Sequence, residues 1–166
     1  GVFPMSVTLA REETFNAFLS EDRTRAFFHG HTFTAHPVGC AVALASLELT
    51  LGNDAPAQLD GIGNRIAHRL CERIGTIDHV KNMRRTGGIV AFDLELEEGS
   101  AGYFAQVAPE LRARAIELGV LIRPLGNVVY ALPPACVTDE EADRIADVMA
   151  TLAEEAPQFA AKGSRG

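Results

Sequence analysis

Residues 28–46 combine a polar loop with a helix of small side chains. In the loop, backbone N–H groups beside Gly30 and the hydroxyl of Thr32 are donors that suit a phosphate or a carboxylate. Pro37 predicts the first turn of the helix, because its fixed φ and missing N–H are tolerated there. Small residues then let the helix pack closely against a neighbour: Gly39, Cys40, Ala41, Ala43, Ala45 and Ser46. The stretch predicts an anion contact presented by Gly30, His31 and Thr32 from a rigid base.

Two other kinds of chemistry fit this stretch less well. Zinc prefers histidine and thiolate ligands, which His29, His31, His36 and Cys40 could supply. The His-x-His pair is not a complete ligand set, however, and the loop has no carboxylate. Cys40 falls on an apolar helix of small residues, which does not favour an activated thiolate nucleophile. We therefore predict neither a metal site nor a cysteine nucleophile.

Arg123 is the second residue whose type and place point to chemistry. It ends the short apolar run at 120–122 and precedes Pro124. A guanidinium at such a position needs a partner, and its planar fork matches a carboxylate in two parallel hydrogen bonds. From the residues alone, a structural salt bridge with one of the 22 acidic residues and a contact with a bound carboxylate both remain open.

Hydrophobic spacing and capping signals predict the elements that position these residues. The first part of the chain is predicted to have a strand at 5–10 and helices at 11–19, 37–51 and 54–74, the last capped by Asp54. An extended piece at 76–80 and a turn at 83–88 are predicted to follow. The later part is predicted to have strands at 89–96, 120–122 and 127–132, helices at 103–118 and 138–155, and a loose tail at 157–166. This order predicts an α/β fold whose later part is an α+β unit, with a mostly antiparallel sheet and helices on one face.

Composition narrows the class of protein. The 166 residues are 47% hydrophobic, enough for one ordinary core, and the net charge is −7. An acidic chain argues against nucleic acid and anionic membranes as partners. Three cysteines without a paired spacing indicate reduced thiols, and no apolar run approaches the ~18 residues of a membrane span. We expect a cytoplasmic protein.

Two motifs resemble the class III, fold type I aminotransferases, which use pyridoxal 5'-phosphate (PLP). The first is His-Gly-His-Thr-Phe-Thr followed by proline and a small-residue helix, and the second is Arg-Pro-Leu-Gly-Asn followed by Val-Tyr-Ala-Leu-Pro-Pro. The resemblance implies that Thr32, with the backbone at His31, contacts the PLP phosphate of the neighbouring subunit of a homodimer. It further implies that Gly30 lies by the substrate and that Arg123 binds the substrate carboxylate.

The resemblance also implies a division of the chain and a missing group. Residues 1–52 would be the C-terminal tail of the PLP-binding large domain, and residues 53–166 the C-terminal small domain. Neither Lys81 nor Lys162 lies in the family's context for the Schiff-base lysine. We therefore expect a C-terminal fragment of a longer enzyme, with that lysine upstream, no catalytic residue of its own and no activity alone.

Within the family the sequence looks most like the branch that transfers an amino group from S-adenosylmethionine to 8-amino-7-oxononanoate, giving 7,8-diaminononanoate in biotin biosynthesis. An ω-amino acid:pyruvate or diamine aminotransferase is the alternative within the family. A non-catalytic α/β module that binds a small molecule is the alternative outside it, although that reading leaves residues 28–46 unexplained.

Overall fold

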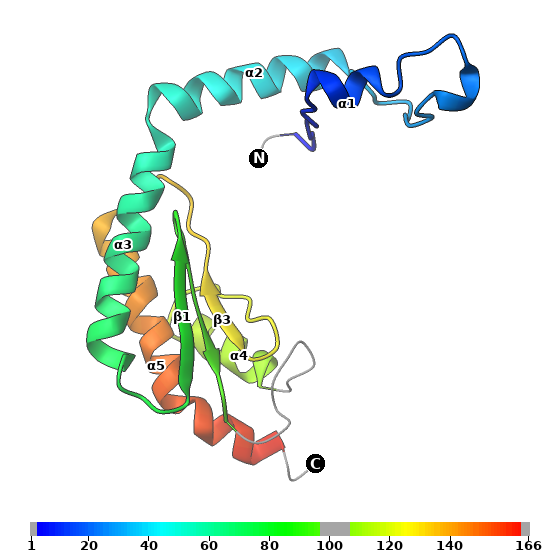
Figure 1. Ribbon diagram of the computed structural model, residues 1–166. Helices are drawn as coiled ribbons and strands as arrows, with labels where there is room; N and C mark the ends of the chain where they lie inside the picture. Colours follow the sequence, from blue (N-terminus) through cyan, green and yellow to red (C-terminus); the bar gives the residue numbers. More distant parts are fainter. Residues whose placement is uncertain (1–2, 97–106, 164–166) are drawn as a thin grey trace. The chain divides into compact units, whose positions relative to one another are not determined.

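The computed structural model describes residues 3–96 and 107–163, which belong to two compact units, Gly1–Asn53 and Asp54–Gly166. The elements of the first unit are α1 (Glu12–Asn16), the 3-10 helix η1 (Arg23–Arg25) and α2 (Pro37–Gly52). Those of the second are α3 (Ala55–Ile74), β1 (Val80–Thr86), β2 (Ile89–Leu94), α4 (Ala108–Glu117), β3 (Val128–Ala131) and α5 (Asp139–Gly163) (Figure 1). The assignment of these units to the large and the small domain remains a prediction.

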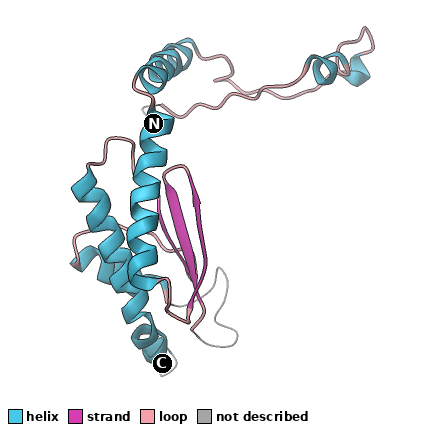
Figure 2. Ribbon diagram, turned by 60° about the vertical axis from the view of Figure 1, so that its left-hand side comes forward, coloured by secondary structure: helices cyan, strands magenta, loops and turns pink. Residues whose placement is uncertain are grey.

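The second unit is built around an antiparallel sheet in the order β1-β2-β3. Phe92 of β2 pairs with Val129 of β3, and Arg85 of β1 pairs with Val90 of β2. Helices α3 and α5 lie side by side against one face of this sheet (Figure 2). The predicted fold class, an α/β chain with an antiparallel sheet covered by helices, is confirmed.

The core lies between the sheet and these helices. Alternate residues of β2 point into it, and the side chain of Phe92 is completely buried. On α3 the side chains at helical spacing face this core, since Ile66, Leu70 and Ile74 are fully buried and Ile62 nearly so. Fully burying one such side chain contributes about 1.5–3 kcal/mol, so a core of this kind can stabilise the second unit.

Ion pairs join the outer sides of α3 and α5. Arginines at intervals of four residues on α3 contact carboxylates of α5, each with a nitrogen–oxygen distance below 3 Å: Arg65 with Asp143 (2.6 Å), Arg69 with Asp147 (2.7 Å) and Arg73 with Glu154 (2.7 Å). The hydrogen bonds from Arg65 and Arg69 lower the pKa values of Asp143 and Asp147 below the usual range for aspartate.

Helix α5 begins as predicted and ends later than predicted. Glu141 N–H donates to Thr138 Oγ (3.2 Å) and Thr138 N–H donates to the Glu141 carboxylate (2.8 Å), so the two residues form a capping box at the predicted start of the helix. The helix continues through Pro157 to Gly163, so the predicted end at 155 and the predicted loose tail at 157–163 are wrong. Ala156 is fully buried, which shows that the packed face of α5 extends beyond the predicted end.

The hairpin of β1 and β2 corrects the prediction for residues 76–88. Residues 76–79 form turns rather than an extended piece, and residues 83–86 belong to β1 rather than to a turn. Strand β1 is an edge strand with mostly exposed polar side chains, and Asn82 (φ 50°) sits where its register with β2 shifts. Such an edge strand lacks the apolar alternation that sequence patterns detect.

Two other predicted strands are absent. Residues 5–10 and 120–122 form no strand, because none of the described strands pairs with either segment. Strands β2 and β3 and helix α2 agree with the predictions to within two residues at each end. Helix α1 is shorter than predicted, and the predicted beginning of the helix at 103 lies outside the described residues.

The start of α3 differs from the prediction. Asp54 does precede α3, but it adopts a left-handed conformation (φ 46°) and its side chain makes no capping hydrogen bond, so the predicted cap is wrong. At the C-terminal ends of the helices, Gly75 directly follows α3, and Gly119 lies two residues after the end of α4. Among the described residues, no helix is both long enough and apolar enough to cross a membrane.

Candidate functional site

The loop before α2 is a tight double turn. The N–H of Thr34 donates to the carbonyl of His31 (2.9 Å), and the N–H of His36 donates to the carbonyl of Phe33 (3.2 Å). Side chains close the same turns, because His31 N–H donates to Thr34 Oγ (3.0 Å) and Phe33 N–H donates to His31 Nδ1 (3.1 Å). The predicted polar loop is therefore folded by its own side chains.

His36 fixes the junction between this loop and α2. Its Nδ1 accepts a hydrogen bond from the N–H of Gly39 (3.1 Å), which makes His36 the N-cap ahead of Pro37. Its ring is stacked on that of Phe3, with the ring centres 5.5 Å apart and the planes at 6°. The sequence signalled the start of the helix through Pro37, but not this cap, because histidine is not among the common N-cap residues.

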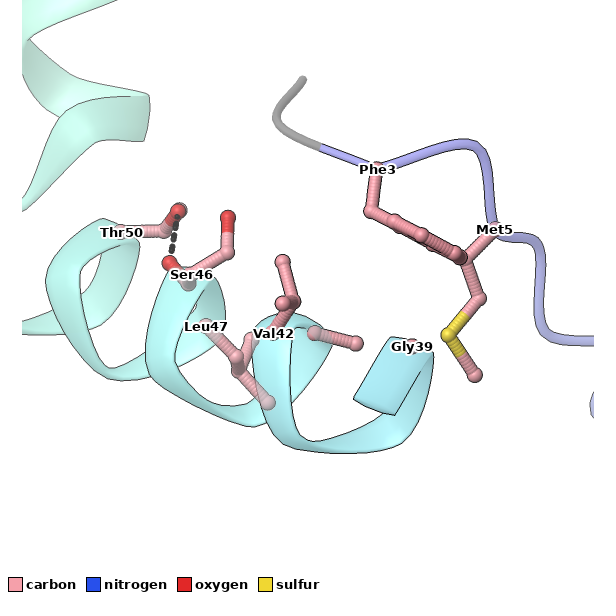
Figure 3. A pocket seen from close by; sticks show the side chains of 8 residues that line it. Phe3, Met5, Gly39, Val42, Ser46, Leu47 and Thr50 are labelled. Carbon is pink, nitrogen blue, oxygen red and sulfur yellow. Dashed lines mark hydrogen bonds between the residues drawn. The ribbon is translucent and has the colours of Figure 1, made fainter. Parts of the chain in front are cut away.

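Gly39 lets the beginning of the chain lie against α2. It is the one buried residue among the described residues of the first unit. A Cβ atom on Gly39 would come within 3.2 Å of the Phe3 ring and 3.4 Å of the Met5 sulfur. Figure 3 shows Phe3 and Met5 over Gly39, at one end of a hollow of about 270 Å³ that continues along α2 past Val42 and Leu47.

A larger cavity of about 620 Å³ separates the first residues of the chain from the loop. Gly30 and His31 line it, together with residues between Phe3 and Thr8 and the loop residues on to His36. Thr32 is exposed and is not among the residues that line the cavity. The three residues predicted for the anion contact are thus consecutive on one loop, with two of them facing a common space.

Thr32 has free hydrogen-bond donors. Within the described residues, the N–H groups of His31, Phe33, Thr34 and His36 are all engaged inside the loop, whereas the N–H and the hydroxyl of Thr32 have no partner. Two adjacent donors that face solvent suit an oxyanion. The loop supplies them without a positive charge on Thr32 itself.

Arg123 lies in the second unit, between a buried residue and a hairpin. Ile122 is buried, while Arg123 is exposed and makes no ion pair with the acidic residues that the structure describes. The following hairpin turn is closed by two hydrogen bonds between Leu125 and Val128, and Gly126 takes the positive φ (62°) that such a turn requires. Arg123 is therefore available to a partner outside these residues.

Gly30, His31 and Thr32 belong to the first unit and Arg123 to the second. Neither unit by itself brings the two groups into one site. The roles predicted for them remain predictions.

Comparison with known proteins decides the family. The aminotransferase class-III family matches residues 1–152. The chain belongs to the class III aminotransferases. Proteins of this family generally depend on PLP. The resemblance drawn from the two motifs is confirmed.

The class III relatives include an adenosylmethionine-8-amino-7-oxononanoate aminotransferase of Synechococcus elongatus. It is 42% identical over 156 residues, an alignment that covers 93% of this chain and 35% of the relative. The chain thus spans about a third of the length of this relative and of the relative of the same name from Geobacter sulfurreducens. The prediction that the chain is most like this branch of the family is confirmed.

Solved class III structures are similar as well. The adenosylmethionine-8-amino-7-oxononanoate aminotransferase of Methanocaldococcus jannaschii superposes with a TM-score of 0.72 at 25% identity, covering 87% of this chain and 34% of that one. An engineered ω-transaminase from Pseudomonas jessenii superposes with a TM-score of 0.68 at 26% identity, covering 81% of this chain and 30% of that one. The fold is therefore shared by solved structures that carry the names of two different transaminases.

Proposed function

We propose that this chain is the C-terminal part of a PLP-dependent aminotransferase that transfers an amino group from S-adenosylmethionine to 8-amino-7-oxononanoate. The observation that carries the proposal is the similarity, over nearly the whole chain, to relatives named for that reaction. The proposal includes a cytoplasmic homodimer and a cofactor-binding lysine that lies outside residues 1–166. It follows that the chain is inactive when produced alone.

The loop geometry fits the phosphate of PLP. The N–H and the hydroxyl of Thr32 face solvent, and they would hold a phosphate that is bound in the neighbouring subunit. The backbone N–H of His31 already donates to Thr34 Oγ (3.0 Å), so a contact from that group requires this bond to be exchanged. When bound, PLP supplies the electron sink for the chemistry at the amine carbon, and the protein supplies binding and orientation.

The remaining residues would bind and orient the substrates. Gly30 has open space around its α-carbon, where an added Cβ would meet only Thr34 Oγ at 3.8 Å, so a substrate can approach the backbone. Arg123 would hold the carboxylate of the acceptor in two parallel hydrogen bonds. With the acceptor fixed at its far end, its reacting carbon is held in place for the transfer.

The amino donor is the sharpest test of this proposal. We expect the full-length protein to form 7,8-diaminononanoate with S-adenosylmethionine as donor. Turnover with β-alanine or a diamine, and none with S-adenosylmethionine, would instead support the second candidate, an ω-amino acid or diamine aminotransferase. The similarity to an ω-transaminase structure gives that candidate its support.

Replacement of the proposed carboxylate-binding residue tests the site itself. In the full-length protein, Arg123→Ala removes a charged hydrogen-bonding partner whose loss typically costs about 1.5–3 kcal/mol, or roughly 10-fold to 150-fold in binding. We therefore expect the KM for 8-amino-7-oxononanoate to rise by that factor and the KM for the donor to change little. Equal changes in both constants would assign Arg123 a structural role.

A further inference from the structure

We propose that His36 is a positioning residue, whose Nδ1 cap on α2 sets the conformation of the loop that carries Thr32. The inference rests on the proposed function, because it concerns the phosphate contact assigned to Thr32. The side chain of His36 is not placed against the phosphate. It acts through the loop.

The contacts of His36 tie together three separate pieces of the first unit. Its Nδ1 accepts from the N–H of Gly39, which satisfies a donor at the first turn of α2. Its ring stacks on Phe3 from the start of the chain and meets the ring of Phe33 edge-on, at 6.1 Å between centres and 68° between planes. Each contact restrains the imidazole in a different direction.

From His36 the restraint passes toward Thr32 through two hydrogen bonds. His36 N–H donates to the carbonyl of Phe33 (3.2 Å), and Phe33 N–H donates in turn to His31 Nδ1 (3.1 Å). The neighbours of Thr32 on both sides are therefore held in a chain of bonds that starts at the backbone of His36, the residue that also caps α2. The donors of Thr32 are left outside that chain, since within the described residues they bond to none of the loop's own acceptors.

Backbone strain at Ala35 makes the anchor necessary. Ala35 has a φ of 54°, a left-handed conformation that side chains other than glycine rarely adopt. Such a conformation persists only where the surrounding structure imposes it. Ala35 lies directly before His36. Loss of the cap on α2 would therefore free Ala35 to relax and the double turn to open.

The test uses the full-length apoenzyme and two ligands, PLP and pyridoxal, which lacks the phosphate. Their affinity ratio isolates the phosphate contact, whereas a general folding defect weakens both ligands together. We expect His36→Ala to weaken PLP about fivefold, which corresponds to the ~1 kcal/mol typical of a lost N-cap, and to leave the affinity for pyridoxal unchanged.

Two matched variants separate the cap from the ring. Asparagine is a good N-cap without an aromatic ring, so His36→Asn is expected to restore PLP affinity to within about twofold of the original protein. His36→Phe retains a ring that can stack on Phe3 but has no acceptor, and we expect it to behave like His36→Ala. Rescue by phenylalanine but not by asparagine would overturn the proposal, as would an equal loss for both ligands.

A fourth variant distinguishes failure of this inference from failure of the proposed function. Thr32→Val removes the hydroxyl but retains the shape of the side chain. If it leaves the ratio of PLP to pyridoxal affinity unchanged, the phosphate role of the Thr32 hydroxyl fails, and the role of His36 in positioning that hydroxyl fails with it. If Thr32→Val lowers the ratio and His36→Ala does not, only the inference about His36 is overturned.

Discussion

The two units of the chain differ in where their apolar side chains lie. In the part of the chain that the structure describes, every buried hydrophobic residue belongs to the second unit. Helix α2 of the first unit is rich in apolar residues, yet Leu44 is 63% exposed and Leu49 67% exposed. An apolar helix of this kind is normally covered by protein. The second unit therefore carries its own stability, whereas we expect the first to gain stability from surfaces outside these residues.

The largest expected effect is in the core of the second unit. Phe92→Ala removes a completely buried ring, which typically costs about 3–5 kcal/mol in the free energy of unfolding. The matched change in the first unit, Leu44→Ala, removes an exposed side chain, and we expect a loss below about 0.5 kcal/mol. Urea unfolding, with amide hydrogen exchange in β2 and α2 as separate reporters, measures both. Similar losses would mean that the first unit has a core of its own.

A close approach of two glycines gives the second prediction. A Cβ atom on Gly63 of α3 would collide with the carbonyl oxygen of Gly87 in the β1–β2 turn, which is backbone and cannot swing aside. We expect Gly63→Ala to lower the free energy of unfolding by about 1–3 kcal/mol or more.

Gly61, on the same helix, is the control. An added Cβ there meets open space, so Gly61→Ala is expected to stabilise the helix by about 1 kcal/mol. Thermal or urea unfolding of both variants reports the difference in sign. Stabilisation by both substitutions would show that the helix and the turn are free to separate.

The smallest effect concerns the ion pairs between α3 and α5. The pKa values of Asp143 and Asp147 are lowered in the folded state by hydrogen bonds from arginines. The stability that these groups contribute is present above their unfolded pKa and is lost as the pH falls through the folded one. We expect the urea midpoint of the second unit to fall as the pH drops from about 5 to about 3.

Arg69→Gln sharpens this test. It removes the arginine that hydrogen-bonds the Asp147 carboxylate, so the loss on acidification is expected to be smaller than in the original chain. High salt should weaken the same pairs, since both sides are partly exposed. An unchanged acid dependence in the variant would show that other carboxylates govern it.

The packed parts of the second unit could be predicted from the sequence, for a physical reason. Burial on one side imposes a spacing on the sequence, which is visible at Ile66, Leu70 and Ile74 and in the alternation around Phe92. Local capping chemistry is visible too, as at Thr138. Strand β1 was missed because an exposed edge strand imposes no such spacing. The segment at 5–10 was predicted as a strand from its residue types, which cannot reveal that no strand pairs with it.

The residues of the candidate site also differ in how far the sequence reveals them. Gly30, Thr32 and Arg123 could be singled out because motifs and residue chemistry mark them in the sequence. His36 could not, because its role depends on the folded positions of Gly39 and Phe3, one of which is 33 residues away in the chain. Residues proposed to bind a ligand are thus more readily recognised in this sequence than the residue proposed to hold one of them in place.

His79 replaces a hydrogen bond that Pro157 removes from helix α5. Proline has no N–H, so Pro157 leaves the carbonyl of Ala153, four residues earlier in α5, without its usual helical donor. His79 Nε2 lies 2.8 Å from that oxygen, and a carbonyl can only accept. His79 therefore stands in for the missing amide with its Nε2–H tautomer. A side chain from the turn before β1 thus completes the hydrogen bonding of a helix that a proline would otherwise interrupt.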